Sequence, residues 1–331
     1  MEKWIAVTGG CGYIGSHIAC QIRENTDHKV LIIDRAASTM RHTHWLADEL
    51  VDDDMVSDAA TAALLALRPQ AIIHCAGTSL VGPSISDPSD YYHNNVVKTL
   101  QILDLMRNNR LNNIIFSSSA AVYGESWATV CDEDSPPEPI NPYGNTKAII
   151  ETMLRDYSKA YGINSMSFRY FNAAGADPQS RFGQAKDATH LLARIMENVL
   201  YGKELTVYGN KYPTKDGTCV RDYAHVCDIA RAHVLAIDHL KFNQGAHVLN
   251  LGSGNGTTVM EMIEATARVI GKEPSYTIGT ERIGDPAILI ANTHRANIDL
   301  KWQPRYNLGN IVLDARNWYL SDYYNSLKTG N

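Results

Sequence analysis

The 331-residue sequence lacks several features that would assign it to a particular class of protein. It has no apolar run of 18 or more residues, so no membrane-spanning helix is expected. Its 30 basic residues are outnumbered by 36 acidic ones, and the net charge of −6 argues against a nucleic-acid-binding surface, which needs a basic patch. The N-terminal residues lead directly into a predicted strand at 4–8, which leaves no room for a signal peptide.

Cysteines are few and have no regular spacing. The six include no Cys-x-x-Cys pair, so neither a zinc site nor a disulfide framework is expected. Scattered, reduced thiols are typical of a cytoplasmic protein. The sequence also contains no internal repeat and no low-complexity segment. Its hydrophobic content of 44% is that of a globular protein with a large buried core.

The first 170 residues alternate short apolar runs with longer amphipathic segments. Strands are predicted at 4–8, 30–34, 71–75, 113–117 and 165–169. The helices predicted between them include 13–24, 91–107 and 143–161. Apolar strands that alternate with helices indicate an α/β fold, a Rossmann-type doubly wound parallel sheet covered by helices on both faces. Ligands of such sheets bind beyond the carboxyl ends of the strands.

The pattern changes after about residue 170. Glycine- and proline-containing polar stretches there separate shorter helices and strands, which predicts a smaller C-terminal α/β domain that binds substrate. We therefore expect a dinucleotide-binding domain at 1–170 and a substrate domain at 171–331, with some segments of the second part returning to the first. Residues 41–54 are assigned to no element.

A glycine-rich loop follows the first predicted strand. It reads TGGCGYIG and places Gly9, Gly12 and Gly15 where a strand turns into a helix. Glycines permit a tight turn and let a pyrophosphate approach the helix N-terminus, where the dipole favours an anion. Asp34 ends the second strand and is predicted to bind the adenosine ribose, which favours NAD over NADP, although the neighbouring Arg35 could offset that preference. The alternative is an ordinary tight turn.

A tyrosine and a lysine stand at the start of another predicted helix. In NPYGNTKAII (141–150), Asn141 is a suitable N-cap and Pro142 a suitable first-turn residue, so Tyr143 and Lys147 share one helix face. An ammonium about 4 Å from the phenol favours the phenolate by roughly 4 kcal/mol at an effective dielectric of about 20. We therefore expect Lys147 to lower the pKa of Tyr143, which would let Tyr143 act as a general base.

The surroundings of this pair matter more than its spacing. The same spacing recurs at Tyr324 and Lys328, which we interpret as surface residues of the C-terminal tail. Near Tyr143, by contrast, the motif FSSSAAVYG ends a predicted strand in serines 117–119. One of these serines could share the substrate proton with Tyr143; the alternative is that they only terminate the strand.

Motifs along the whole chain resemble a known family. TGGCGYIG, HCAG (74–77), FSSSAAVYG and PYGNTK resemble the extended short-chain dehydrogenases/reductases. The second half narrows this resemblance to the UDP-glucose 4-epimerase family. Its motifs are FRYFNAAGADP (168–178), VYGNKYPTKDGTCVRDYAHVCDIARAH (207–233), NLGSGNGTTV (250–259) and ERIGDPAILIAN (281–292).

The resemblance implies roles for individual residues. It implies that Ser119 and Tyr143 meet the 4-hydroxyl of the sugar and that Lys147 binds the nicotinamide ribose. The implied NAD-binding residues are Gly9, Gly12, Tyr13, Ile14, Gly15, Asp34, Asp54, Met55, Cys75, Ala76, Gly77, Ser79, Asn94, Ser119, Tyr143, Lys147 and Phe171. The implied UDP-sugar-binding residues are Ser119, Tyr143, Asn172, His190, Leu191, Thr206, Val207, Tyr208, Arg221, Arg282, Asp285 and Leu289. It also implies a homodimer formed through helices of the NAD domain.

The sequence departs from the family pattern at several positions. Ser79 replaces a lysine that holds the cofactor in many members, and His190 replaces an asparagine of some. Leu289 is less bulky than the tyrosine that some members carry at this position, which suggests tolerance of N-acetylated UDP-sugars. Arginines suit a diphosphate because their forked donors bind two oxygens at once. For Arg221 the alternative is a salt bridge to Asp222 or Asp228.

The expected reaction is interconversion of UDP-glucose and UDP-galactose through a 4-keto intermediate. The alternatives are an epimerase that prefers N-acetylated UDP-hexoses or a UDP-pentose, and another NAD-dependent nucleotide-sugar enzyme. A 4,6-dehydratase would need an Asp-Glu pair where this chain has Ala120 and Ala121 after Ser119. A non-catalytic protein on the same fold would not need to keep Ser119, Tyr143 and Lys147 together.

Overall fold

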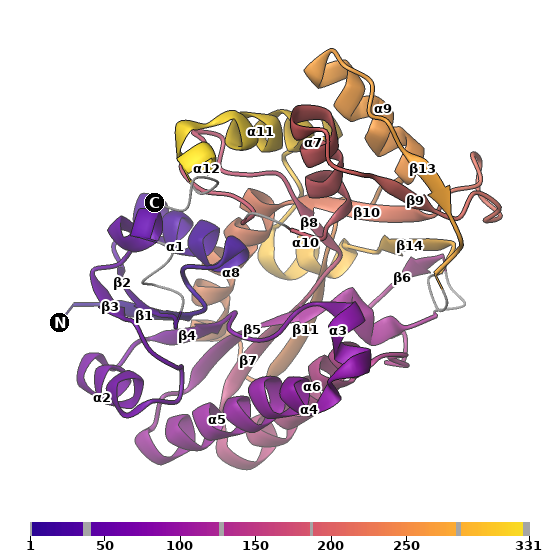
Figure 1. Ribbon diagram of the computed structural model, residues 1–331. Coiled ribbons are helices and arrows are strands. Elements are labelled where there is room, and N and C mark those ends of the chain that lie inside the picture. Colours follow the sequence, from indigo (N-terminus) through magenta and orange to yellow (C-terminus); the bar gives the residue numbers. More distant parts are fainter. Residues whose placement is uncertain (1, 36–40, 126–128, 186–187, 283–285, 327–331) are drawn as a thin grey trace.

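A parallel sheet of seven strands forms the centre of the protein (Figure 1). The structure is a computed structural model, and it describes residues 2–35, 41–125, 129–185, 188–282 and 286–326. The strands of the sheet are β1 (Trp4–Thr8), β2 (Lys29–Ile33), β3 (Glu49–Val51), β4 (Ala71–His74), β5 (Asn113–Ser119), β7 (Asn164–Tyr170) and β11 (Ala246–Leu251). Their order across the sheet is β11-β7-β5-β4-β1-β2-β3, and every neighbouring pair is parallel.

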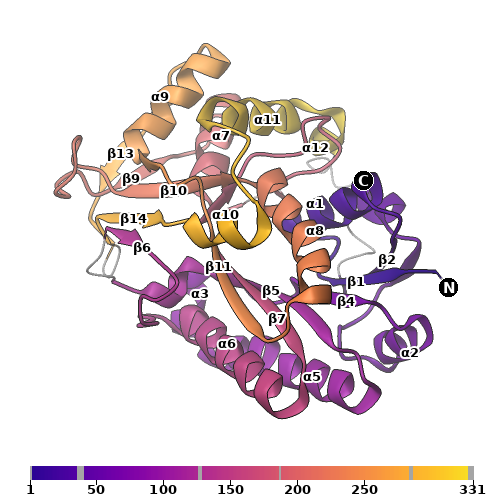
Figure 2. The ribbon, with the colours of Figure 1, turned by 180° about the vertical axis from the view of Figure 1, so that it is seen from behind.

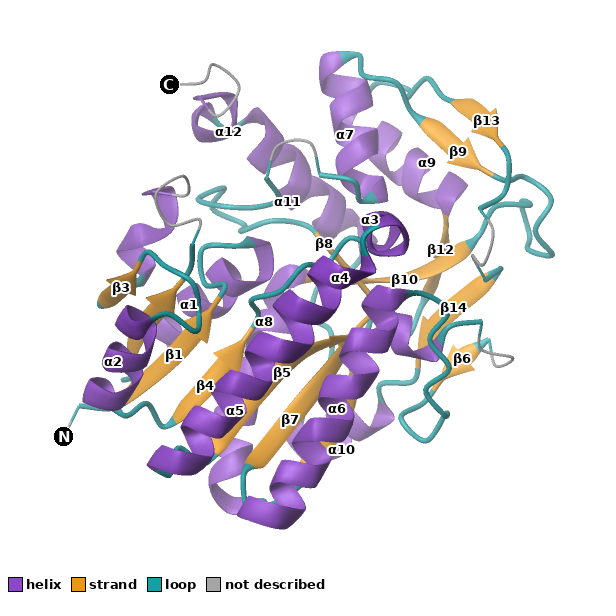
Figure 3. Ribbon diagram, turned by 60° about the horizontal axis from the view of Figure 1, so that its bottom comes forward, coloured by secondary structure: helices purple, strands orange, loops and turns teal. Residues whose placement is uncertain are grey.

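Helices cover both faces of this sheet, as Figure 3 shows. On one face, Ile5, Val7 and their neighbours pack with α1 (Tyr13–Asn25) and α8 (Val226–Phe242). On the other, Ala6, Leu31 and their neighbours pack with α2 (Asp58–Leu67), α5 (Lys98–Asn109) and α6 (Pro142–Tyr161). Because successive strand residues point to opposite faces, strands that are apolar throughout contribute to both cores. The predicted doubly wound fold is confirmed.

The second half of the chain, joined by β6 (Val130–Cys131) from the first half, builds a smaller region beyond the carboxyl ends of the main strands. There β8 (Asn172–Ala174), β10 (Val220–His225), β12 (Gly256–Thr258), β14 (Ile288–Ala291) and β6 form one sheet. A two-stranded sheet joins β9 (Thr206–Tyr208) to β13 (Thr277–Gly279). Helices α7 (Leu191–Tyr201), α9 (Val259–Ile270) and α11 (Leu308–Leu320) lie together at the top of Figure 1 and share one apolar core.

Shorter helices connect these parts. In Figure 2, which views the protein from behind, α10 (His294–Leu300) lies toward the viewer and next to α8. The others are η1 (Arg41–Leu46), α3 (Val81–Ser86), α4 (Pro88–Tyr91), the π-helix η2 (Tyr92–Val97), η3 (Ala120–Tyr123) and α12 (Asp322–Ser326). Residues 41–54, which the sequence left unassigned, therefore contain η1 and β3. None of the described helices combines the length and the apolarity that crossing a membrane requires.

Tyr324 corrects one expectation. We expected it on the surface, but its side chain is 1% exposed and belongs to the core formed with α7 and α11. It packs edge-on against Trp318, and its hydroxyl donates to Glu197. Lys328, the second member of that pair, lies outside the described residues. The prediction was wrong because it treated the end of the chain as a tail, whereas α12 folds back onto the core.

Candidate active site

The glycine loop brings backbone amides to the start of α1. A Cβ atom on Gly9, which has a φ of +69°, would lie 2.8 Å from the nitrogen of Ala76, and one on Gly15 would lie 2.1 Å from the carbonyl oxygen of Gly9. Both positions therefore require glycine. Asp34 follows β2 and accepts a hydrogen bond from the amide of Cys11 at 2.9 Å. The loop thus places a carboxylate beside the helix N-terminus, where an anion is favoured.

The loop opens into a cavity of about 560 Å³ at the carboxyl ends of the main strands. All seventeen residues expected to bind NAD line this cavity, from Gly9 on the loop to Phe171 after β7. Asn172, His190 and Leu191, expected to bind the UDP-sugar, line it too. A dinucleotide fits this arrangement because the glycines leave the α1 amides uncovered, while Asp34 offers acceptors for ribose hydroxyls.

The start of α6 places Tyr143 in the wall of the cavity. Asn141 caps the helix, its side-chain oxygen accepting a hydrogen bond from the amide of Gly144 at 2.8 Å. A Cβ atom on Gly144 would lie 2.5 Å from the carbonyl oxygen of Ala121, so this turn of α6 packs directly against the backbone that follows β5. That packing brings Tyr143 to the end of β5, where Ser119 interacts with its hydroxyl.

Lys147 lies one turn further along α6 and is almost completely buried. Its ammonium donates to the carbonyl oxygen of Ser117 at 2.8 Å and lies 5.6 Å from the centre of the Tyr143 ring. Burial lowers the pKa of Lys147 to about 8, against the opposing effect of Cys75 and Glu151. The lysine is therefore near its point of ionisation at moderately alkaline pH.

The ionisation of Tyr143 corrects a second expectation. Burial raises the pKa of Tyr143, and the interaction with Ser119 acts in the opposite direction without reversing the shift. The expected lowering by Lys147 is wrong for the protein alone, because the lysine ammonium is directed to Ser117 and the phenol is desolvated. Further positive charge at the site is needed to make Tyr143 a base near neutral pH.

The other residues expected to bind substrate are not among the described residues that line the cavity. Thr206, Val207 and Tyr208 form β9, and the guanidinium of Arg282 lies 4.1 Å above the Tyr208 ring. Leu289 lies on β14 and packs against the apolar cluster that contains Phe171. Asp285 lies outside the described residues.

Arg221 lies on β10, level with Leu289 on the adjacent strand β14. It is 9% exposed, and its guanidinium donates to the carbonyl oxygen of Val220. The two carboxylates considered as its salt-bridge partners both accept backbone hydrogen bonds. Asp222 accepts from the amide of Ser253 at 2.5 Å, and Asp228 from that of Arg305 at 2.8 Å.

Several residues that line the cavity were not predicted from the sequence. Tyr170 and Tyr223 lie at or near the ends of β7 and β10, so the rule that ligands bind at carboxyl ends of strands could have identified them. The hydroxyl of Tyr170 contacts that of Ser117 at 3.0 Å and His233 at 2.6 Å. Gln184 lies in a loop, and no sequence signal marks it.

The chain is similar to known proteins along most of its length. Residues 5–252 match the NAD dependent epimerase/dehydratase family. A UDP-glucose 4-epimerase of Halalkalibacterium halodurans is 38% identical over 322 residues, which cover 95% of either chain.

Solved structures of UDP-glucose 4-epimerases are also similar to this chain along nearly its whole length. The UDP-glucose 4-epimerase of Brucella ovis in complex with NAD is 38% identical, with a TM-score of 0.90 over 95% of this chain and 98% of that one. The UDP-glucose-4-epimerase of Stenotrophomonas maltophila, with bound NAD and formylated UDP-arabinopyranose, is 31% identical, with a TM-score of 0.92 over the whole of both chains.

Proposed function

The chain belongs to the NAD dependent epimerase/dehydratase family, and from this premise we propose that it is a UDP-glucose 4-epimerase that interconverts UDP-glucose and UDP-galactose with NAD as cofactor. One observation carries the proposal. Ser119, Tyr143 and Lys147 converge with the glycine loop on a single cavity, in a chain that matches UDP-glucose 4-epimerases along nearly its whole length.

We assign the binding of NAD to the residues around the glycine loop. The amides at the start of α1 suit the pyrophosphate, and Asp34 suits the hydroxyls of the adenosine ribose. Lys147 is assigned to the nicotinamide ribose. The chemistry supplied by bound NAD is reversible removal of hydride from carbon 4 of the hexose, which leaves no net oxidation.

Tyr143 is the proposed general base. It takes the proton of the 4-hydroxyl group and returns it when the 4-keto sugar is reduced, while Ser119 hydrogen-bonds the same oxygen. Burial raises the pKa of Tyr143, so the positive charges of Lys147 and of the nicotinamide must stabilise its phenolate. The sugar has to turn over between the two steps, so the nucleotide must be held firmly and the hexose loosely.

We assign the UDP moiety to the region around β9, β10 and β14. Arg221 and Arg282 supply positive charge for the diphosphate, and Asn172 lies between that region and the cavity. His190, Leu191, Thr206, Val207, Tyr208 and Asp285 complete the proposed site. Leu289 is next to the cluster around Phe171, so its size would affect which sugars are accepted.

We further propose that the protein acts in the cytoplasm as a homodimer. The six cysteines are free thiols, which suits a reducing compartment. Apolar side chains that support the homodimer are exposed on one side of the NAD-binding region, namely Val97 on η2, Leu100 on α5 and Ile149 on α6. Burial of this apolar surface against a second copy would be favourable.

The function is tested with purified protein that has received no added cofactor. We expect NAD to be released on denaturation and UDP-galactose to be converted to UDP-glucose. Absence of both would favour a non-catalytic protein, and a 4-keto-6-deoxy product would favour a dehydratase. Parallel assays with UDP-N-acetylglucosamine and a UDP-pentose would identify the preferred sugar, and failure to convert UDP-N-acetylglucosamine would rule out the tolerance suggested by Leu289.

A further inference from the structure

The face of α6 that carries Tyr143 and Lys147 continues to a third residue. Glu151 follows Lys147 by four positions, so the three side chains lie on consecutive turns of one helix face. Glu151 is 3% exposed, so its carboxylate is held inside the protein. Burial of a carboxylate is costly unless it is paired and hydrogen-bonded, so the position calls for an explanation.

Three consecutive serines of β5 contact these three residues. Lys147 donates to the carbonyl oxygen of Ser117 at 2.8 Å, and the hydroxyl of Ser118 donates to Glu151 at 2.5 Å. Ser119 interacts with Tyr143 at the end of the strand. Polar groups of β5 and α6 therefore interact along three consecutive turns of the helix. The contact between Ser118 and Glu151 is the last of these interactions along α6.

Arg169 on β7 fixes the carboxylate of Glu151 from the other side. Its Nε and Nη2 atoms donate to the two carboxylate oxygens at 3.0 and 2.7 Å, and both side chains are almost completely buried. Such a pair is weak evidence for stability, because desolvation offsets the attraction of the charges. The pair instead holds the Glu151 carboxylate in one position, because the planar guanidinium of Arg169 binds both carboxylate oxygens in a fixed orientation.

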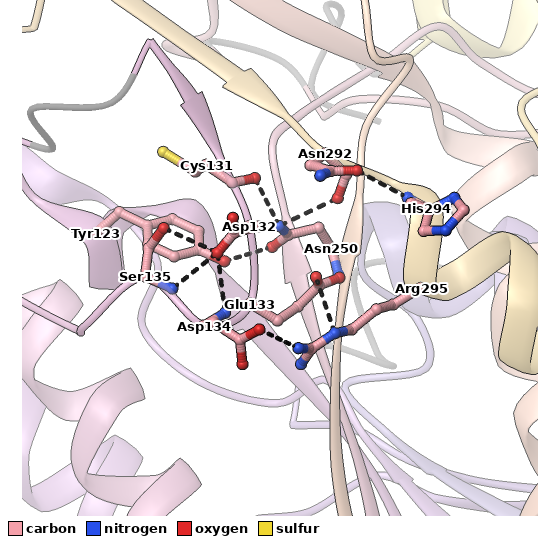
Figure 4. A network of polar contacts seen from close by, with 10 residues as sticks. All are labelled: Tyr123, Cys131, Asp132, Glu133, Asp134, Ser135, Asn250, Asn292, His294 and Arg295. Carbon is pink, nitrogen blue, oxygen red and sulfur yellow. Dashed lines mark hydrogen bonds and ion pairs between the residues drawn. The ribbon is translucent and has the colours of Figure 1, made fainter.

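A second network supports Arg169. Its guanidinium lies 4.8 Å from the centre of the Tyr123 ring, and the Tyr123 hydroxyl donates to Asn250 at 2.7 Å. In Figure 4, Asn250 is the centre of a group in which its amide donates to Glu133 and its side chain to Cys131. The Glu151 carboxylate is therefore anchored through contacts that lie away from the cavity.

The charges around Lys147 show what Glu151 contributes. Two acidic groups, Cys75 and Glu151, would favour the Lys147 ammonium if each were ionised. Burial raises the pKa of Cys75 to about 11, so its thiol is neutral near pH 7. Tyr143 and Tyr170 also have raised pKa values, and burial lowers that of His74 to about 3, so these neighbours are uncharged too. Glu151 is left to supply the compensating charge.

We propose that Glu151 is a positioning residue for the epimerase reaction: fixed by Arg169 and Ser118, its carboxylate keeps Lys147 charged and in place beneath Tyr143. The inference rests on the proposed function and extends it beyond the residues that meet the cofactor and the sugar. Glu151 itself touches neither and acts through Lys147.

The test compares Glu151→Gln with the wild-type enzyme over a range of pH. Without the carboxylate, the pKa of Lys147 falls further, so the ammonium is lost at lower pH. We expect the alkaline limb of the kcat profile to move by about 1 pH unit to lower pH. KM for UDP-galactose and the amount of NAD that co-purifies should stay close to wild type.

Two further variants separate charge from packing. Glu151→Asp keeps the charge and should restore the wild-type profile even if the protein is less stable. Because Glu151→Gln leaves Arg169 buried and unpaired, it could fail to fold. The double variant Glu151→Gln, Arg169→Gln removes the carboxylate and the buried cation together, so the alkaline limb should move in the same direction as in Glu151→Gln but by a smaller amount.

Glu197 provides a matched control on α7. It is also a buried glutamate, paired with Lys203 at 3.0 Å, but it lies in the core of the smaller region. Glu197→Gln should lower the melting temperature and leave the pH profile of kcat unchanged. A shift of that profile equal to the shift in Glu151→Gln would mean that lost stability causes the effect, and this would overturn the proposal.

A measurement that does not depend on activity completes the test. Titration of Lys147 is followed by NMR of protein labelled with ¹³C at lysine Cε, with its signal assigned through Lys147→Met. We expect its midpoint to fall by about 1 pH unit in Glu151→Gln. If the wild type is active and the midpoint does not move, the inference alone is wrong. If the wild type has no epimerase activity, the proposed function is wrong and the inference falls with it.

Discussion

At the scale of single residues, the reactivity of Tyr143 depends on charges that the phenol cannot supply for itself. Desolvation in the cavity wall raises the pKa of Tyr143, while Lys147 is directed to Ser117. A neutral phenol with a raised pKa is a poor base near neutral pH. We therefore expect Tyr143 to become a base only once the cofactor site is filled.

Replacement of Tyr143 by phenylalanine tests its role directly. Tyr143→Phe removes only the hydroxyl, so we expect turnover to fall by roughly 10²- to 10⁴-fold, the usual contribution of a general base. NAD should still co-purify. The control is Tyr157→Phe on the same helix, where the lost hydroxyl bonds Asp104 of α5 and activity should be unaffected. A Tyr143→Phe enzyme with near-normal turnover would remove Tyr143 from the mechanism.

Which site residues could be predicted depended on how each is positioned. Gly9, Asp34 and Tyr143 are fixed by local rules of turns, strand ends and helix caps, so the sequence was enough to place them around one cavity. The direction of the Lys147 ammonium depends on the carbonyl of Ser117, thirty residues away. Desolvation of Tyr143 likewise depends on the packing of distant segments around it, so its raised pKa could not be anticipated.

At the scale of elements, α6 carries the reactive groups in its first turns. Its N-cap, Asn141, therefore affects both stability and geometry. We expect Asn141→Ala to lower the free energy of unfolding by about 1 kcal/mol and to lower kcat as well, because the loosened first turn contains Tyr143. Chemical denaturation and steady-state kinetics measure the two effects.

Ser57→Ala is the matched control, because Ser57 caps α2 in the same way through the amide of Ala60 at 3.1 Å. A similar loss of stability is expected there, with kcat unchanged. If the two variants reduce kcat equally, the cap of α6 has no special role in the reaction.

The strands were predictable where they are apolar throughout, and β1 was placed at its observed bounds. Two strands of the main sheet were missed for different reasons. β3 has three residues, too few for a periodic pattern. β11 comes after a long insertion of other elements, and only its pairing with β7 reveals that it belongs to this sheet.

At the scale of the whole molecule, the proposed homodimer makes a prediction about surface residues. Leu100→Glu places a charge on the exposed apolar surface of α5 and should shift the protein from dimer to monomer. Light scattering after size-exclusion chromatography measures the mass. Phe242→Glu is the control, because Phe242 is 86% exposed at the end of α8 and its replacement should leave the mass unchanged. A wild-type monomer would contradict the proposal.

Three buried histidines predict how stability depends on pH. Burial lowers the pKa of His17 and His74 to about 3 and that of His233 to about 4. The unfolded chain binds these protons near pH 6.5. The stability is therefore fully present above pH 6.5 and falls as the pH drops toward 4, by up to about 1.4 kcal/mol per pH unit for each histidine.

Denaturant unfolding at pH 7, 6 and 5 measures this slope. His74→Gln should make the slope shallower, whereas replacement of the exposed His93 by glutamine should not. Equal slopes in the wild type and His74→Gln would show that His74 does not contribute.

The position of β11 has a consequence for how the chain is made. Its partner in the sheet is β7, yet Ser165 on β7 pairs with Ala246, 81 residues later. During synthesis, β7 therefore leaves the ribosome long before the strand that will cover it. An uncovered parallel edge is a template for pairing with other chains. The nascent protein must pass through an aggregation-prone stage that lasts until residue 251 has emerged, so slow translation between β7 and β11 should reduce the yield of folded enzyme.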